Sequence, residues 1–260
     1  MGSATTTITA DEYLRDLLKR EAVNTGMKSP LRAFRKEIQE VCLGLTDGKL
    51  LGLHPTGGFE KGTVNASGIS IDYLASFAPT TLEPMRELYE RLFEAFERRG
   101  LETVRRDVSV AVLMGDYGVD IIPAKREAMS SDMHELWLSR LGRPIKSDLT
   151  QHILNTATSG RREEIRVLKL WRDQQGLDFP SYYLELSIVA ALRRRPQGEL
   201  AANVWAVFGY LEALFPARSV LDPVNANNIV SDMLGPPGKD NIRRAALYAR
   251  RARAWTEIVW

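Results

Sequence analysis

The sequence GGFEKGTVNASGISID, at residues 57–72, is the stretch that decides the fold. It opens with two adjacent glycines, Gly57 and Gly58, which allow a tight turn and a close approach of the backbone to a phosphate group. It closes on a short apolar run in which Ser70 and Asp72, two residues apart on a strand, face the same side. The stretch therefore predicts a glycine-rich turn that leads into a strand bearing a carboxylate.

A second carboxylate, Asp120, lies in the apolar run VDIIPAKR at residues 119–126. An aspartate inside such a run needs a partner for its charge. Magnesium is bound mainly by carboxylate oxygens, and two Mg²⁺ ions about 3.5–4 Å apart can hold the attacking and leaving oxygens of a phosphoryl transfer. Asp72 and Asp120 suit two of the metal-ligand positions, whereas Ser70 stands where a third carboxylate is expected.

The composition is that of an ordinary soluble protein, with 44% hydrophobic and 26% charged residues, and 260 residues suffice for one large domain or two small ones. The net charge of +2 excludes a polycationic tail but allows local basic patches. No apolar run approaches the ~18 residues that span a bilayer, and residues 1–14 lack the layout of a signal peptide. The single cysteine, Cys42, lies in an apolar helical register and has no partner for an intramolecular disulfide. We expect a cytoplasmic protein that is not inserted in a membrane.

The order of predicted elements gives an α+β fold with two lobes. The first lobe, residues 1–146, begins with two helices, one capped by Thr9 or Asp11 and one opening at Ser29–Pro30. A mixed β-sheet with further helices follows, and the second lobe, residues 147–260, is almost wholly helical. The predicted strands cover residues 49–53, 70–77, 108–114 and 117–122, and the later helices cover 59–63, 81–99, 149–158, 162–174, 180–193, 200–215 and 239–258. Two lobes leave a cleft between them, where ligands commonly bind.

Several motifs occur in an order that resembles one superfamily. Gly57–Gly58, a spacer of 11 residues, SID and later VDIIPA are similar to the pattern of DNA polymerase β-type nucleotidyltransferases. FEKGT at residues 59–63 resembles the branch that contains archaeal-type CCA-adding enzymes, oligoadenylate synthases and the bacterial cyclic-oligonucleotide synthases of anti-phage defence. IRVLKLWRDQQGLDFPSYYLELSIVAAL at 165–192 and LDPVNANNIVSD at 221–232 resemble its lysine-bearing helix, its Ser-x-x-x-Glu segment and its late loop. The resemblance covers about residues 45–255 and implies a two-lobed nucleotidyltransferase fold.

The resemblance also implies roles for individual residues. Gly57 and Gly58 would meet a triphosphate with backbone amides, and Asp72 and Asp120 would hold Mg²⁺ or Mn²⁺, with Ser70 in the first metal-ligand position. The other implied nucleotide-binding residues are Lys61 after the turn, Lys169 at the β and γ phosphates, Ser181 at the phosphate tail, and Tyr182 or Tyr183 as a surface for base stacking.

Each of these residues also has a simpler structural interpretation. Gly57–Gly58 can be a tight turn, and Lys169 can pair with Glu163 or Asp173 on its own helix for ~0.3–0.5 kcal/mol. The two tyrosines can belong to the core. It is the occurrence of all these motifs in one order that favours nucleotide binding.

Serine at position 70 has three explanations. A hydroxyl is a neutral and weaker magnesium ligand than a carboxylate, so the change costs several kcal/mol of charge stabilisation, or ~10³ in rate. The chain is then a deliberately inactivated variant, a natural pseudoenzyme that still binds nucleotide, or an enzyme that recruits another acid. Glu60 and Asp116 are the nearest candidates for that acid.

The expected function is Mg²⁺-dependent use of NTPs or dNTPs to make a short cyclic or linear oligonucleotide signal, in bacterial anti-phage defence. The alternatives are a non-catalytic nucleotide- or RNA-binding protein and a tRNA 3′-end nucleotidyltransferase. Further expected partners are a nucleic acid or an effector protein, and the oligomeric state is left open.

Two groups of residues outside the motifs complete the expectations. The histidines His54, His134 and His152 show no metal-ligand spacing, although His54 lies close enough to the turn to touch a phosphate. A basic C-terminal segment either contacts a nucleic-acid backbone or forms a solvated helix face; its arginines are Arg243, Arg244, Arg250, Arg251 and Arg253.

Overall fold

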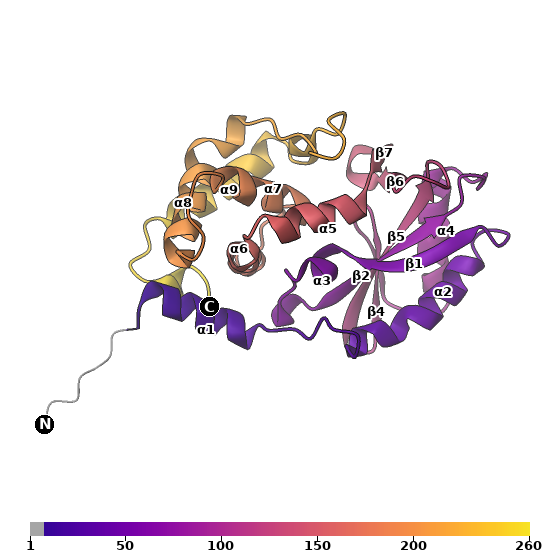
Figure 1. The fold of residues 1–260 in the computed structure, drawn as a ribbon, viewed down its shortest axis with the longest axis horizontal. Helices are drawn as coiled ribbons and strands as arrows, with labels where there is room; N and C mark the ends of the chain where they lie inside the picture. The colour runs from indigo at the N-terminus through magenta and orange to yellow at the C-terminus, as the bar shows by residue number, and fades with distance from the viewer. Residues whose placement is uncertain (1–7) are drawn as a thin grey trace, which may run out of the picture.

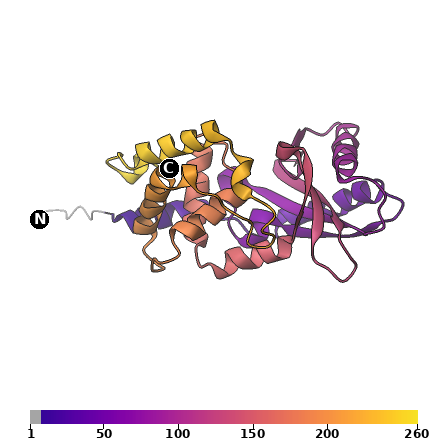
Figure 2. The ribbon, with the colours of Figure 1, turned by 90° about the horizontal axis from the view of Figure 1, so that it is seen from above.

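A computed structural model of the protein describes residues 8–260, so the expectation about a signal peptide falls partly on residues outside the described part of the chain. Figure 1 shows a twisted sheet with its covering helices on one side of the molecule and a group of helices on the other, and Figure 2 shows the same division at right angles. The helices are α1 (Ala10–Arg20), α2 (Arg35–Leu43), α3 (Gly57–Lys61), α4 (Met85–Glu97), α5 (Leu149–Thr158), α6 (Arg162–Gln174), α7 (Ser181–Ala191), α8 (Leu200–Ala213) and α9 (Pro236–Ala249).

Within the described residues the sheet has seven strands in the order β1-β2-β5-β4-β3, with β6 beside the end of β5 and β7 beside β6. β2 and β5 run parallel and the other neighbours are antiparallel, so the predicted mixed sheet and the α+β fold class are confirmed. The strands are β1 (Leu50–Thr56), β2 (Ser70–Phe77), β3 (Thr103–Arg105), β4 (Val110–Met114), β5 (Tyr117–Arg126), β6 (His134–Leu138) and β7 (Arg143–Ser147).

Alternation along β2 divides its side chains between the two faces of the sheet. Tyr73 and Phe77 point to one face and pack in a core with apolar residues of α2 and α4. Asp72, Leu74 and Ser76 point to the opposite face, near which α3 and α5 lie. The sheet therefore presents its carboxylate-bearing face toward the helical part of the molecule.

Two strands continue through the prolines at which the sequence predicts that they end. Pro55 lies within β1, which has a single neighbour among the strands of residues 8–260, so its missing N–H can face outward without costing a ladder hydrogen bond. Pro123 lies within β5 at the point where pairing with β4 has stopped at Ile121 and pairing with β6 has not yet begun at Ala124. Both prolines thus occupy positions where the missing backbone N–H costs the strand little stability.

Other boundaries differ for local reasons. The helix predicted from residue 81 begins at Met85, because Pro84 disfavours a helical conformation in the residue before it. The last predicted helix begins earlier, at Pro236, and ends at Ala249. The sequence prediction also lacks the hairpin of β6 and β7, although HELWL at residues 134–138 alternates between buried and partly buried positions.

The first helix packs with the helical lobe rather than with the sheet. Thr9 caps α1 and forms a capping box with Glu12, which confirms the predicted start. Its apolar stripe, Leu14, Leu17 and Leu18, joins the core formed by α6–α9. This helix therefore buries its apolar stripe in the helical part of the molecule, although it precedes the sheet in the chain. The division of the chain into residues 1–146 and 147–260 stays a prediction.

Within the described residues, none of the helices combines the length and the apolar character needed to cross a bilayer.

Candidate active site

Two carboxylates lie side by side on the face of the sheet that α3 and α5 approach. Asp72 on β2 and Asp120 on β5 are paired positions of the parallel ladder, so their side chains leave the same face at the same height. Desolvation, and after it the nearby Asp120 carboxylate, raise the pKa of Asp72 to about 7, although Lys169 and Lys61 act to lower it. Desolvation also raises the pKa of Asp120, whose Oδ1 accepts a hydrogen bond of 2.9 Å from Ser109 Oγ.

The donor set fits a divalent cation that prefers oxygen ligands. Two desolvated carboxylates raise each other's free energy when both are ionised, and a cation between them removes that cost. Within residues 8–260 no group of three acidic, histidine or cysteine side chains meets at one point. The structure thus provides two carboxylates, and Ser70 stands two residues before Asp72 on the same face of β2.

Neither acid suggested as a substitute for the missing carboxylate joins this pair. Glu60 Oε1 lies 2.6 Å from Arg32 Nη2, and its charge is matched there. Asp116 is exposed in the turn between β4 and β5, four residues before Asp120. Recruitment of Glu60 or Asp116 is therefore not how this arrangement compensates for Ser70.

The glycine turn packs directly on Asp72. Gly57 has a φ of 59°, and a Cβ added there would lie 2.1 Å from Asp72 Oδ2. The N–H of Gly58 donates a hydrogen bond of 3.2 Å to the same oxygen. The glycine turn and Asp72 are therefore in direct contact, and this contact could not be predicted from either glycine by itself.

Substitution of Gly57 by alanine is expected to lower the free energy of unfolding by about 1–3 kcal/mol, because a residue with a Cβ is strained at positive φ and would also displace Asp72. Gly58→Ala is the matched control, since its Cβ would meet nothing closer than Lys169 Nζ at 3.6 Å, an ordinary contact. Urea unfolding followed by tryptophan fluorescence measures the free energy of unfolding of both variants. Equal losses in the two variants would contradict the special role of Gly57.

Two lysines and a glutamate form a buried ion-pair group opposite the glycine turn. Lys61 Nζ lies 2.7 Å from Glu185 Oε2, and Lys169 Nζ lies 2.8 Å from Glu185 Oε1. Lys169 Nζ also donates to Thr63 Oγ1 at 3.0 Å, and Thr156 Oγ1 donates to Glu185 at 3.4 Å. These residues come from α3 and the segment directly after it, and from α5, α6 and α7, so the group joins the turn to the helical lobe. The suggested pairing of Lys169 with Glu163 or Asp173 does not occur.

Charge explains why this group is stable. Desolvation alone would raise the pKa of Glu185, but Lys169 and Lys61 together hold it at about 2. Desolvation lowers the pKa of Lys169, and Glu185 opposes that shift. The sequence analysis includes Glu185 in the Ser-x-x-x-Glu segment but assigns it no role in the site. A second signal was present, because a glutamate inside the apolar run YYLELSIV at residues 182–189 needs a buried partner.

The remaining predicted nucleotide-binding residues lie at the start of α7. Ser181 is exposed, and its Oγ accepts a hydrogen bond of 2.7 Å from Arg172 Nη1. The Tyr182 ring stacks on His152 with centroids 4.0 Å apart and has Lys61 Nζ 5.3 Å from its centroid. Tyr183 is fully buried in the helical core, so it does not provide a surface for a base. Base stacking by Tyr182 stays a prediction, and a base there would share the ring with His152.

A second buried polar group holds the late loop at 221–232 against the first turn of α5. Asp222 accepts hydrogen bonds from Tyr182 OH at 2.9 Å and from Ser147 Oγ at 3.0 Å. His152 Nε2 lies 3.2 Å from Asp222 and 3.0 Å from Ser147 Oγ. A Ser-His-Asp catalytic triad uses one ring nitrogen for each partner, whereas both contacts here involve Nε2. The group is therefore a structural network, and its hydrogen bonds hold the pKa of Asp222 below its ordinary value despite desolvation.

The basic C-terminal segment is partly neutralised within the protein. Arg243 and Arg244 both pair with Asp240 on α9, and Arg250 contacts Glu212 on α8. These pairs favour the interpretation of the segment as a solvated helix face. Binding of nucleic acid to it stays a prediction.

The metal-free protein is expected to lose stability, relative to an Asp72→Asn variant, as pH rises from 3.8 to about 7. The folded state holds the Asp72 proton more tightly than the unfolded state, so this contribution is complete below the unfolded pKa and lost above the folded pKa, at no more than about 1.4 kcal/mol per pH unit. Urea unfolding in EDTA at several pH values checks this. If the free energy of unfolding changed with pH in the same way for the parent and for Asp72→Asn, the prediction would be contradicted. Added Mg²⁺ at pH 7 should restabilise only the parent.

No family model and no curated protein matches the chain. Solved structures do match its fold. CdnC of E. coli MS115-1 with ATP is 19% identical, with a TM-score of 0.75 over 94% of this chain and 91% of its own; in its complex with HORMA-deltaN it is 20% identical, with a TM-score of 0.71 over 92% and 88%. The Bradyrhizobium diazoefficiens CD-NTase CdnG with GTP is 13% identical, with a TM-score of 0.70 over 95% and 94%. A cytoplasmic RNA terminal U-transferase is 12% identical, with a TM-score of 0.58 over 94% of each chain. The chain therefore has the fold of CD-NTases and polymerase β-type nucleotidyltransferases, as its motifs predict.

Proposed function

We propose that this protein is a Mg²⁺-dependent nucleotidyltransferase that joins NTPs or dNTPs into a short cyclic or linear oligonucleotide signal, in bacterial anti-phage defence. The observation that carries the proposal is the pair Asp72 and Asp120, at matched positions of two parallel strands and directly against the Gly57–Gly58 turn. The fold shared with CdnC and CdnG, whose structures contain ATP and GTP, supports the same reaction class.

In the proposed reaction, a sugar hydroxyl of one nucleotide forms a bond to the α-phosphorus of an NTP, and the bond from that phosphorus to the bridging oxygen breaks to release pyrophosphate. Mg²⁺ or Mn²⁺ held by Asp72 and Asp120 would supply neutralisation of the phosphate charge and a lower pKa for the attacking hydroxyl. Ser109 orients Asp120 through its hydrogen bond. The backbone at Gly58 and the ammonium groups of Lys169 and Lys61 lie on the side of Asp72 where the triphosphate would be bound.

A second candidate function is non-catalytic binding of a nucleotide or RNA. It is favoured by one observation, the neutral Ser70 at a position where the catalytic arrangement needs charge, with no third acid joining Asp72 and Asp120 within residues 8–260. Such a protein would keep the lysines and the glycine turn but transfer no nucleotide. A tRNA 3′-end nucleotidyltransferase remains a third alternative.

Incubation with labelled NTPs or dNTPs and Mg²⁺ or Mn²⁺, followed by mass spectrometry of the products, separates these functions. We expect an oligonucleotide product that Asp120→Asn abolishes, whereas the control Asp116→Asn, in the exposed turn four residues earlier, leaves it unchanged. Formation of product by the parent excludes the candidate function of binding without catalysis. A labelled tRNA end supports the tRNA 3′-end nucleotidyltransferase. Absence of product from both the parent and a Ser70→Asp variant contradicts the proposed function.

The proposal also includes the substrates, the cellular compartment and the partners of the reaction. Its substrates would be NTPs or dNTPs, and it would act in the cytoplasm, with a nucleic acid or an effector protein as a further partner. CdnC, which has the same fold, has been solved in a complex with HORMA-deltaN, which gives the effector-protein alternative its support.

A further inference from the structure

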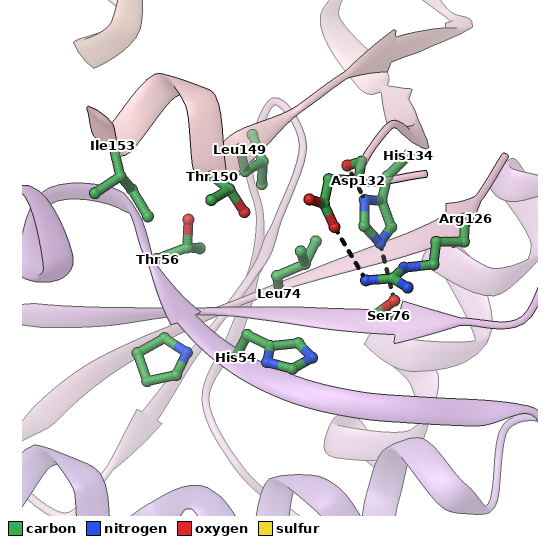
Figure 3. Close-up of a pocket in the computed structure, with 11 residues that line it drawn as sticks. His54, Thr56, Leu74, Ser76, Arg126, Asp132, His134, Leu149, Thr150 and Ile153 are labelled. Carbon is green, nitrogen blue, oxygen red and sulfur yellow. Dashed lines mark hydrogen bonds and ion pairs between the residues drawn. The ribbon is translucent and has the colours of Figure 1, made fainter. Parts of the chain in front are cut away.

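A cavity of about 300 Å³ lies on the same face of the sheet as the two carboxylates. β1 and β2 form its floor and the first turns of α5 form its opposite wall, as Figure 3 shows. Its near end contains Thr56, which is paired with Asp72 across the ladder of β1 and β2. None of the functions assigned above to the glycine turn or to the lysines uses this cavity.

The cavity extends away from the carboxylates along the strands. Leu74 and Ser76, two and four residues after Asp72 on the same face, both line it. At ~3.3 Å per residue, its far end lies roughly 13 Å along the strand from Asp72. A nucleoside whose sugar hydroxyl reaches Asp72 and Asp120 would therefore place its base over Leu74 and toward Ser76. The triphosphate of the other nucleotide would lie on the opposite side, at Gly58 and Lys169.

The far end of the cavity is polar and carries both hydrogen-bond donors and an acceptor. Arg126 Nη2 lies 3.3 Å from Asp132 Oδ1, and Arg126 Nη1 donates to the Met129 carbonyl at 3.1 Å. The Arg126 Nε atom is buried and has no hydrogen-bond partner within residues 8–260. Beside them, His134 is hydrogen-bonded to Ser76 at 2.9 Å, and Figure 3 shows Ser76, Arg126, Asp132 and His134 gathered at this end.

His54 provides a ring next to this polar end. A Cβ at Gly52 would lie 2.6 Å from His54 Nε2, so the imidazole folds back over Gly52, which is paired with Ser76. Desolvation, Arg126 and Arg35 lower the pKa of His54, which keeps the ring neutral near pH 7. A neutral imidazole is suited to stacking on a base.

We infer that this cavity binds the base of the acceptor nucleotide and selects guanine through Arg126 and Asp132; the inference rests on the proposed nucleotidyltransferase function. Guanine presents O6 and N7 as acceptors for an arginine fork, and its N1–H and N2–H₂ groups are donors for a carboxylate. Adenine offers an amino donor where guanine offers O6, so it meets Arg126 donor to donor. Thr56 and Leu74 contact the sugar and the base face, and the choice of base is made at the far end.

Binding of GMP and AMP to the parent, with the triphosphate site filled by α,β-methylene-ATP and Mg²⁺, tests this inference by calorimetry. We expect GMP to bind about fivefold or more tightly than AMP, the range that one good bidentate contact gives. Arg126→Met should abolish the preference. Arg143→Met, on exposed β7 and away from the cavity, should leave it unchanged.

The outcomes separate this inference from the proposed function. If the parent binds none of the α,β-methylene analogues of ATP, GTP, CTP and UTP, the proposed function fails. If it binds an analogue but prefers neither nucleotide, or if Arg126→Met keeps the preference, the guanine inference alone is overturned. Asp132→Asn covers the case in which Arg126→Met does not fold, because the Asp132 side chain is 65% exposed. That variant should reduce GMP affinity without changing AMP affinity, and unchanged GMP affinity overturns the inference.

Discussion

Replacement of Ser70 by aspartate is expected to raise the rate of nucleotide transfer by about 10³-fold, because several kcal/mol of charge stabilisation separate a carboxylate from a hydroxyl as a metal ligand. The side chain at position 70 leaves β2 on the same face as Asp72, and its ladder partner is Gly118, which has no side chain to obstruct a longer residue. The measurement is the initial rate of product formation from labelled NTPs over a range of Mg²⁺ concentrations.

Ser70→Asn is the matched control for this prediction. Asparagine has nearly the size of aspartate and carries no charge, so it should produce no comparable gain. Equal rates for the Asn and Asp variants would show that volume rather than charge matters at position 70. If neither the parent nor Ser70→Asp forms product while both bind the ATP analogue, the binding-only function is the correct one.

Replacement of Glu185 by glutamine is expected to lower the free energy of unfolding by about 3–5 kcal/mol, since it leaves two buried ammonium groups without their counter-charge. Lys61 and Lys169 both lie within 2.8 Å of this carboxylate, and the side chains of all three residues are less than 10% exposed. Because the group links α3 to α6 and α7, we also expect weaker binding of the ATP analogue. Urea unfolding and calorimetry measure the two effects.

An exposed ion pair supplies the control for Glu185. Glu90 lies 2.8 Å from Arg105 with both side chains well exposed, so Glu90→Gln should cost no more than about 1 kcal/mol. The stability that Glu185 provides should be complete above its unfolded pKa of 4.5 and lost as pH falls toward about 2. A loss below about 1 kcal/mol in Glu185→Gln would contradict the buried ion-pair assignment.

The local pattern was sufficient to predict the elements that carry the carboxylates. β2 begins and ends at the predicted residues, because SIDYLASF alternates between the two faces and is bounded by a glycine and a proline segment. The helices α5 and α6 also match, since their apolar residues recur with a helical period and glycines follow them. Boundaries at Pro55 and Pro123 could not be predicted, because the cost of a proline depends on which neighbouring strand needs its N–H.

Contacts between residues distant in sequence were beyond the reach of pattern reasoning. The sequence places Lys169 at the phosphates of a nucleotide or, in the simpler interpretation, in a pair on its own helix; in the structure it pairs with Glu185 on the next helix, beside Lys61. The structural network at Asp222 also brings together residues from the late loop, β7 and α7. Sequence spacing within a helix or strand fixes neighbours along that element, and it carries no information about which element will lie against it.

The sequence by itself determined the α+β fold class, the glycine turn and the identity of the two carboxylates, because these depend on local backbone preference and on alternation along single strands. The tertiary structure decided that Asp72 and Asp120 meet at one height, since the register of two parallel strands is set by the packing of the whole sheet. It also decided that α1 joins the helical core, that Lys61 and Lys169 share Glu185, and that a cavity extends from Thr56 to Arg126. Each of these depends on burial against a distant part of the chain, where apolar area and unpaired charge rather than local geometry set the free energy.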